Sequence, residues 1–255
     1  MATLTWSGPF GFDFKILDLS ALLDGDSYTR TATVFAVNYG TSGYARDEFR
    51  GQGLTYDSNG IPTAGVMTRY AGFLNGSKVG SIDGLGISVP SLVAAANTLS
   101  LSDDRRVFAS ALAGNDQIRG GRYNDKLESF AGNDTLTGGQ GADRLYGGAG
   151  ADVFVFKSIR DSTVSSAGRD VIYDFSTAQR DRIDLHSIDA RTNVAGNQAF
   201  TFIGKNPFHK KAGELRYEKA SGGVMVLGDV NGDGNADFAI HVKGVSSLSK
   251  GYFLL

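Results

Sequence analysis

The chain of 255 residues contains no cysteine and only four prolines, and all three of its histidines lie at or beyond position 186. The absence of cysteine excludes disulfide frameworks, thiolate metal sites, iron–sulfur clusters and cysteine nucleophiles. No apolar run approaches the roughly 18 to 20 residues that cross a bilayer, so we expect no membrane span. The net charge of −2 argues against a broadly basic surface, and we expect no nucleic-acid partner.

Residues required by several hydrolytic mechanisms are also missing. A zinc protease needs H-E-x-x-H to place two imidazoles one helical turn apart, and the chain has no such motif. A Ser/His/Asp hydrolase confined to the N-terminal part is excluded because no histidine precedes His186, and no P-loop or G-x-S-x-G occurs. We therefore expect no enzymatic activity, although glycan hydrolysis by two acids among Asp47, Glu48 and Asp57 stays open.

Glycine and aspartate are abundant instead. The 35 glycines are about twice the usual share of roughly 7%. Aspartate supplies 23 of the 27 acidic residues, although glutamate differs from it by one methylene group. A solvated acidic helix would favour glutamate, whereas aspartate beside glycine is typical of turns and of oxygen-rich loops that bind hard cations.

A period of nine residues runs from 111 to 155, in the blocks ALAGNDQIR, GGRYNDKLE, SFAGNDTLT, GGQGADRLY and GGAGADVFV. The sixth place is always aspartate and the eighth is always apolar. The sixth-place residues are Asp116, Asp125, Asp134, Asp143 and Asp152. The pattern resembles the G-G-x-G-x-D-x-U-x nonapeptide of the calcium-binding RTX repeats, which implies a parallel β-roll with two nonapeptides per coil.

In such a roll, aspartates 18 residues apart stack about one strand spacing of 4.7 to 4.9 Å apart. Two stacked carboxylates repel by roughly 0.8 kcal/mol even in water, so the column opposes folding unless a cation lies between them. Calcium takes six to eight oxygen ligands, including the carbonyls that glycine turns expose. We predict three ions in the central roll, between 116 and 134, 125 and 143, and 134 and 152. The turn glycines expected beside them are Gly114, Gly121, Gly132, Gly139, Gly141, Gly148 and Gly150.

The repeat is imperfect in its earlier blocks. Tyr123 stands at the fourth place, where glycine is expected, and a bulky residue at positive φ costs about 1–2 kcal/mol. Leu112, Ser129 and Phe130 also replace glycines. The best-formed sites are therefore expected on Gly139, Gly141, Gly148 and Gly150.

Residues 155–190 carry the elements F-x-F, D-S-T, D-x-I-x-D-F and D-x-I-D-L. They resemble the segment that closes the β-roll in the C-terminal domain of serralysin-type M10 metalloproteases, and the resemblance covers roughly residues 111–255. It implies that Asp161 and Asp170 are ligands of the last ions, so further calcium ions are open in residues 157–240. We interpret Asp174, Asp181 and Asp184 as turn and strand-end polarity.

The C-terminal region also shows the alternation of antiparallel strands at 199–203, 224–227 and 238–242. Between the last two, residues 229–237 read DVNGDGNAD. Oxygen side chains at Asp229, Asn231, Asp233 and Asp237, with glycine in sixth place, match the front of an EF-hand loop, but Ile240 stands where the bidentate glutamate belongs. A weak calcium loop and a tight hairpin turn are both open.

The start of the chain has neither a basic segment nor a continuous apolar segment of a cleaved secretory signal. Residues 247–255, SLSKGYFLL, partly resemble the uncleaved C-terminal signals read by type I secretion systems, with Lys250-Gly251 in place of an acidic residue. That resemblance implies export from a Gram-negative bacterium through a type I secretion apparatus. Extracellular calcium modules bind at about 10⁻⁴ to 10⁻³ M, so they would fill outside the cell.

We predict an all-β protein of three parts: a β-rich domain at 1–105, a calcium β-roll at 106–156, and a sandwich-like cap with the secretion signal at 157–255. In the first part we expect strands at 29–39, 48–56 and 63–73, a hairpin turn at 57–60, and a short helix at 90–98. Its role is expected to be binding or adhesion to an extracellular glycan or cell-surface ligand, or structural. The alternative is a secreted glycan-active enzyme with its catalytic module in residues 1–105.

Overall fold

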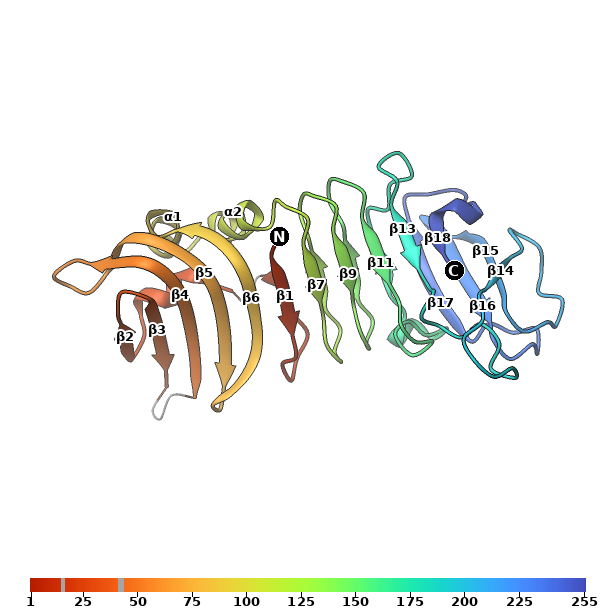
Figure 1. Ribbon diagram of the computed structural model, residues 1–255, viewed down its shortest axis with the longest axis horizontal. Helices are drawn as coiled ribbons and strands as arrows, with labels where there is room; N and C mark the ends of the chain where they lie inside the picture. Colours follow the sequence, from red (N-terminus) through yellow and green to blue (C-terminus); the bar gives the residue numbers. More distant parts are fainter. Residues whose placement is uncertain (15–16, 41–43) are drawn as a thin grey trace.

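The computed structural model describes residues 1–14, 17–40 and 44–255, which form a long body built from two β-sheets (Figure 1). The first sheet has the strand order β18-β13-β11-β9-β7-β1-β6-β5-β4-β3-β2, and the second has the order β14-β15-β16-β17-β12-β10-β8. Two α-helices accompany them among the described residues. The predicted all-β class is confirmed. No helix in the described ranges is both long and apolar enough to cross a membrane.

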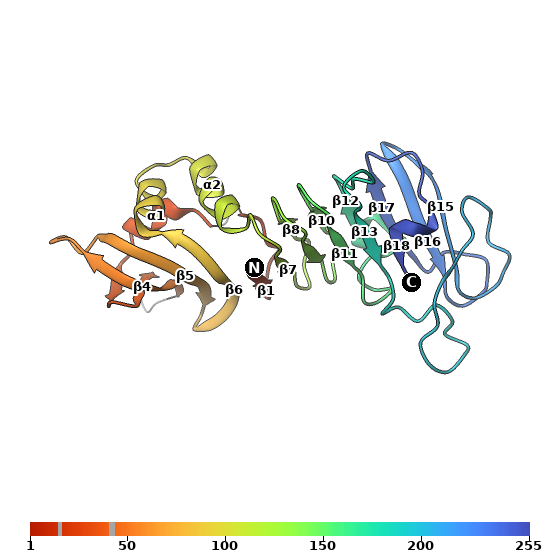
Figure 2. The ribbon, with the colours of Figure 1, turned by 45° about the horizontal axis from the view of Figure 1, so that its top comes forward.

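The N-terminal part is an antiparallel sheet covered on one face. Its strands are β1 (Thr3–Trp6), β2 (Ser27–Arg30), β3 (Val34–Tyr39), β4 (Ala45–Tyr56), β5 (Pro62–Leu74) and β6 (Ser77–Ser88). The helices α1 (Val89–Ala96) and α2 (Leu101–Ala111) cover it together with the 3-10 turn η2 (Leu19–Leu23) (Figure 2). Ser88 caps α1, with Pro90 in the first turn, so the predicted helix is confirmed.

Two expectations for this part need correction. The segment 29–39 is not one strand, because the Thr31 side chain accepts hydrogen bonds from the amides of Thr33 (3.2 Å) and Val34 (2.9 Å) and turns the chain between β2 and β3. Helix α2 was not predicted, although Ser100 caps it and two aspartates occupy its first turn. The hairpin at Asp57 forms as expected, with the Asp57 amide donating to the Ile61 carbonyl at 3.0 Å.

The repeat forms very short parallel strands that alternate between the two sheets. They are β7 (Gln117–Arg119), β8 (Lys126–Glu128), β9 (Thr135–Thr137), β10 (Arg144–Tyr146) and β11 (Val153–Val155), followed by β12 (Val171–Ile172) and β13 (Arg182–Asp184). The eighth-place side chains point between the sheets and are fully buried: Ile118, Leu127, Leu136, Leu145 and Phe154. The spacing of two residues between aspartate and apolar residue thus places one on the edge and the other in the core.

The C-terminal part extends both sheets of the roll. Its strands are β14 (Thr201–Phe202), β15 (Glu214–Ala220), β16 (Gly223–Asp229), β17 (Phe238–Lys243) and β18 (Phe253–Leu254), with 3-10 turns η3 (Ser166–Gly168) and η4 (Lys250–Tyr252). Strands β15, β16 and β17 pair antiparallel, while β17 lies parallel to β12 and β18 lies parallel to β13. The last residues of the chain therefore complete the first sheet.

Strand β1 joins the N-terminal part to the roll, because it lies between β6 and β7 (Figure 1). Leu4 is in register with Ile118, and the amide of Ala2 donates to Asp116 Oδ1. The Phe12 amide donates to Asp125 Oδ1 at 2.5 Å in the same way. Residues 2–14 thus take the place of a coil that precedes the repeat, with Ala2 and Phe12 at the aspartate positions. The predicted boundaries at 105 and 156 stay predictions, and the first sheet is continuous across both.

Helix α2 contacts the irregular block 129–137. Arg105 of that helix forms an ion pair with Glu128, and its guanidinium lies 4.8 Å from the ring centre of Phe130. Phe130, rather than Tyr123, carries the positive φ, at 68°. The expected strain at Tyr123 is therefore wrong, because that turn follows a different backbone path. Leu112 ends α2 and is fully buried, so it belongs to the helix and not to the roll.

Candidate metal centre

Aspartates form a continuous ladder along one edge of the roll. The amide of Asp116 donates to Asp134 Oδ1 at 2.7 Å, and the amide of Asp134 donates to Asp152 Oδ1 at 2.9 Å. The amide of Asp152 then donates to Asp181 Oδ1 at 3.0 Å. Each carboxylate is thus fixed by the backbone of the preceding coil, which leaves its second oxygen to face the turn.

The opposite edge carries a second ladder. The amide of Asp125 donates to Asp143 Oδ1 at 2.8 Å, and the amide of Asp143 donates to Asp170 Oδ1 at 2.9 Å. This ladder ends where the amide of Asp170 donates to Ser162 Oγ at 2.9 Å. Together the two ladders contain five successive aspartate pairs.

The second carboxylate oxygens are the unusual feature of these ladders. Five of them are buried and have no hydrogen-bond partner within the described chain: the Oδ2 atoms of Asp116, Asp134, Asp143, Asp152 and Asp170. A buried acceptor without a donor costs about 1–3 kcal/mol, and more when it is charged. Five in one region indicate a missing electropositive partner rather than chance.

Glycines shape the space around these oxygens. A Cβ added at Gly138 would overlap Asp143 Oδ2, and one at Gly147 would overlap Asp152 Oδ2. At Gly120 it would overlap both Asp125 Oδ2 and the carbonyl oxygen of Gly138, so two oxygens converge on one point. Carboxylate and carbonyl oxygens around a small glycine-lined space are the ligands and geometry that Ca²⁺ prefers.

The positive-φ glycines stack on the preceding coil. Gly139, Gly141, Gly148 and Gly150 have φ of 97°, 127°, 86° and 135°, as expected for the best-formed turns. A Cβ at Gly150 would overlap the carbonyl of Gly132, and one at Gly139 would overlap that of Gly121. Gly132 also has positive φ, whereas Gly114 and Gly121 do not. The turns therefore pack backbone on backbone and leave no room for side chains.

Burial sets the protonation of the ladders. Loss of solvent raises the pKa of Asp134 to about 6 and that of Asp152 to about 7, and neighbouring carboxylates add to both shifts. Burial and mutual repulsion also raise the pKa of Asp143 and Asp170. The charged form of each ladder is thus disfavoured by the protein alone, and a divalent cation would reverse that preference.

The donor set is spread over coils rather than clustered. Within the described ranges, no three His, Asp or Glu side chains come together as a metal cluster. A site here would combine two stacked carboxylates with turn carbonyls, as the glycine-rich repeat predicts. The unpartnered oxygens and the glycine-lined space fit calcium. The positive charge of the ion would neutralise the stacked carboxylates.

The aspartates after the repeat divide into two kinds. Asp170 and Asp181 continue the ladders, so the interpretation of Asp181 as turn polarity misses a position that the geometry aligns with the repeat. The sequence signal for these positions is an aspartate two residues before an apolar residue, as in the repeat. It recurs in Asp170-Val171-Ile172 and Asp181-Arg182-Ile183. Asp174 instead accepts from the amides of Gly147 (3.0 Å) and Gly148 (2.9 Å).

Asp161 lies close to the second ladder without being part of it. One of its oxygens accepts from the amides of Lys157 (2.7 Å) and Ser158 (3.1 Å). Its charge contributes to the raised pKa of Asp143 and Asp170, so it lies near both carboxylates. Its role as a ligand of the last ion stays a prediction.

The loop 229–237 satisfies its own side chains. Asp229 accepts from the amides of Gly232 (2.6 Å) and Gly234 (2.9 Å), and Asp237 accepts from that of Val230 (2.7 Å). Asn231 and Asp233 each accept from the amide two residues later, at 2.8 and 2.7 Å. These bonds account for a tight turn, and calcium binding by this loop stays a prediction.

The three acids considered for glycan hydrolysis are not brought together. Asp47 and Glu48 are neighbours on β4 and therefore point to opposite faces. Glu48 pairs with Arg46 (2.7 Å) and Arg50 (2.6 Å). Asp57 caps its hairpin by accepting from the amides of Asn59 (2.9 Å) and Ile61 (2.8 Å). This geometry does not provide the paired carboxylates that the reaction needs.

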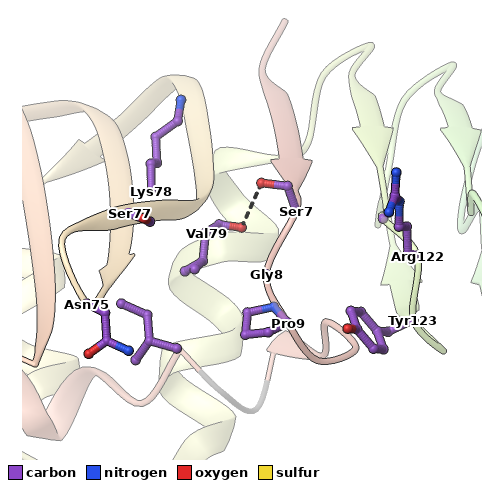
Figure 3. Close-up of a pocket in the computed structure, with 11 residues that line it drawn as sticks. Ser7, Gly8, Pro9, Asn75, Ser77, Lys78, Val79, Arg122 and Tyr123 are labelled. Carbon is purple, nitrogen blue, oxygen red and sulfur yellow. Dashed lines mark hydrogen bonds between the residues drawn. The ribbon is translucent and has the colours of Figure 1, made fainter.

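A groove of about 560 Å³ lies where the N-terminal part meets the roll (Figure 3). The segment Ser7–Pro9 contributes to its lining, and Lys78 and Arg122 stand on either side of that segment. Ser7 Oγ donates to the Val79 carbonyl at 3.4 Å. Its described lining contains no carboxylate, so it does not extend the metal ladders.

Comparison with known families agrees with this geometry. The family model described as Peptidase M10 serralysin C terminal matches residues 87–254, which is more than half of the chain. The chain belongs to this family. Calcium binding by a β-roll is general for RTX-type members, and the resemblance stated from residues 155–190 is confirmed. No curated protein matches the chain.

Two solution structures that match part of the chain come from Azotobacter vinelandii. Both are subunits of its mannuronan C5-epimerase. The first is 27% identical, covers 56% of this chain and 74% of its own, and has a TM-score of 0.40. The second is 26% identical, covers 56% and 89%, and has a TM-score of 0.39. The serralysin C-terminal match, which is much longer than the repeat alone, is the stronger finding.

Proposed function

We propose that the protein is a secreted calcium-binding protein whose β-roll becomes ordered when Ca²⁺ fills the spaces between its stacked aspartates. The observation that carries the proposal is the set of five buried Oδ2 atoms without partners. Three ions lie in the central roll, between 116 and 134, 125 and 143, and 134 and 152. Asp170 and Asp181 extend the ladders and support two more, between 143 and 170 and between 152 and 181.

Export through a type I apparatus fits a roll that becomes ordered only when calcium binds. Phe253 is buried in β18, which is paired with β13 at the edge of the roll. Leu248 is buried as well, so the apolar side chains of a signal in these residues are fully accessible only while the roll is not formed. Low cytosolic calcium would keep it unfolded, and calcium outside the cell would fold the exported chain by mass action.

The N-terminal part is proposed to be a binding module carried by the roll. The second candidate is an enzyme acting on glycans, but the acids on β4 and in its hairpin are held apart by their ion pairs and caps. Turnover of a polysaccharide that Asp47→Asn abolishes, with calcium binding unchanged, would favour that second candidate.

Calcium titration of the chelator-treated protein tests the proposal. We expect far-UV circular dichroism to gain β signal and isothermal titration calorimetry to give at least three ions per chain. Asp143→Ala should reduce the stoichiometry and the thermal midpoint, while Asp24→Ala, at an exposed position of the N-terminal part, should leave both unchanged. An unchanged stoichiometry in Asp143→Ala would exclude the ladder as the calcium site.

A further inference from the structure

A second cavity lies on the inner face of the N-terminal sheet, away from the roll edges. It measures about 260 Å³ and is lined by aromatic rings that include Trp6, Phe10 and Phe73. Tyr39, Tyr70 and Asp47 supply its polar atoms, and Asp18 lies at its rim. Apolar walls with a few convergent polar groups are the usual composition of a small-molecule site.

Asp47 is placed here by the alternation of β4. The side chains of Asp47 and Phe49 point inward, whereas Arg46, Glu48 and Arg50 point outward. One Asp47 oxygen accepts from Tyr70 Oη at 2.7 Å. Tyr39 Oη is also buried and faces the same carboxylate. The cavity therefore contains an acid that two tyrosine hydroxyls approach.

No cationic side chain in the described ranges forms an ion pair with Asp47. Arg46 contributes to the lining, but its guanidinium bonds Glu48 at 2.7 Å and Asn38 at 3.2 Å on the other face. Burial raises the pKa of Asp47, and hydrogen bonds from Tyr70 and Tyr39 oppose that shift only in part. The adjacent Glu48 differs, because Arg46 and Arg50 form ion pairs with it.

We propose that this cavity binds a small organic cation, an ammonium group on a compact apolar body, with Asp47 as its counter-ion. Two carboxylates and several ring faces attract positive charge, and Arg46, the one cationic side chain among the described lining residues, is paired with Glu48. A volume of 260 Å³ lies below the roughly 300–1,000 Å³ of sites for drug-sized ligands, so it suits a head group better than an oligosaccharide. This inference rests on the proposed binding role of the N-terminal part.

The chain provides its own reporter, because Trp6 is its single tryptophan and lines the cavity. The full-length protein at saturating calcium is titrated with choline, with its neutral isostere 3,3-dimethylbutan-1-ol, and with methyl α-glucoside. We expect saturable changes in Trp6 emission with choline alone. Asp47→Asn should weaken choline binding about ten-fold or more. Asp83→Asn, which removes a carboxylate on β6 of the same sheet, should bind choline like the parent protein.

Equal binding of the neutral isostere, or parent-like affinity in Asp47→Asn, would overturn the proposal, and so would a response to the glucoside alone. Because Asp47→Asn could disturb folding, the comparison of choline with its neutral isostere on the parent protein tests the proposal independently of that variant. Calcium stoichiometry measured on the same samples separates the two proposals, since calcium binding without choline binding contradicts only this one.

Discussion

Replacing Asp152 by asparagine should have opposite effects with and without calcium. Asp152 is fully buried, its Oδ1 accepts from the Asp134 amide at 2.9 Å, and its Oδ2 has no partner. Asparagine keeps the first acceptor and removes the charge. The position is therefore suited to separate the cost of burying a carboxylate from the benefit of binding a cation.

The magnitudes follow from the structure. Without calcium, a pKa raised from 3.8 to about 7 corresponds to a penalty on the order of 4 kcal/mol at pH 8, as an upper bound, and Asp152→Asn removes it. With calcium at about one hundred times its dissociation constant, each lost ion costs about 2.7 kcal/mol. Asp152 belongs to two aspartate pairs, so losing both ions costs about 5 kcal/mol. The relieved burial penalty of about 4 kcal/mol offsets most of this cost, which leaves a net loss in calcium of about 1 kcal/mol, or roughly 2–4 °C in thermal midpoint.

Thermal unfolding followed by circular dichroism at pH 8, in calcium and in chelator, measures both effects. We expect the midpoint of Asp152→Asn to lie below that of the parent in calcium and above it in chelator. Asp24→Asn, at an exposed position, should match the parent in both. A midpoint that moves in the same direction under both conditions would refute the assignment of Asp152 to a calcium site.

Three further predictions follow from the same ladders. Without calcium, the free energy of unfolding should fall as pH rises from about 4 to 7. The reason is that the folded-state pKa values of Asp134 (about 6) and Asp152 (about 7) exceed the ordinary value of 3.8, so protonation stabilises the fold. A thermal midpoint in chelator that rises with pH over this window would contradict these pKa shifts. Gly150→Ala should lower the free energy of unfolding in urea by about 3–5 kcal/mol, since it adds both strain at φ 135° and a clash with the Gly132 carbonyl. Gly76→Ala, at φ 73° in open space, should lower it by only about 1–2 kcal/mol. Asp181→Ala should lower the calorimetric calcium stoichiometry and Asp174→Ala should not; equal stoichiometries in the two variants would remove Asp181 from the ladder.

The roll was predictable from sequence because each position of the repeat has a single structural role. Aspartate two places before an apolar residue puts both side chains on the inward side, with the carboxylate in the turn just before the strand and a side chain such as Leu136 in the core. Phe130 was not predictable in this way. Its ring contacts Arg105, which reaches the same block from a helix more than twenty residues earlier, and the repeat pattern does not contain that contact.

The role of the first residues could not be read from composition or period. Ala2 and Phe12 occupy aspartate positions of a coil, but they lie ten rather than nine residues apart and neither carries a carboxylate. Their place depends on pairing between β1 and β7, across more than a hundred residues of chain. The pocket around Asp47 was missed for a similar reason, because its rings come from separated strands and meet only in the folded sheet.

A crystal structure grown in millimolar calcium, with anomalous diffraction data, tests the central claim most directly. We expect anomalous peaks between Asp116 and Asp134, between Asp125 and Asp143, and between Asp134 and Asp152, each beside the Oδ2 atoms that have no partner in the chain alone. Ordered coils with no peak at these positions would contradict the account.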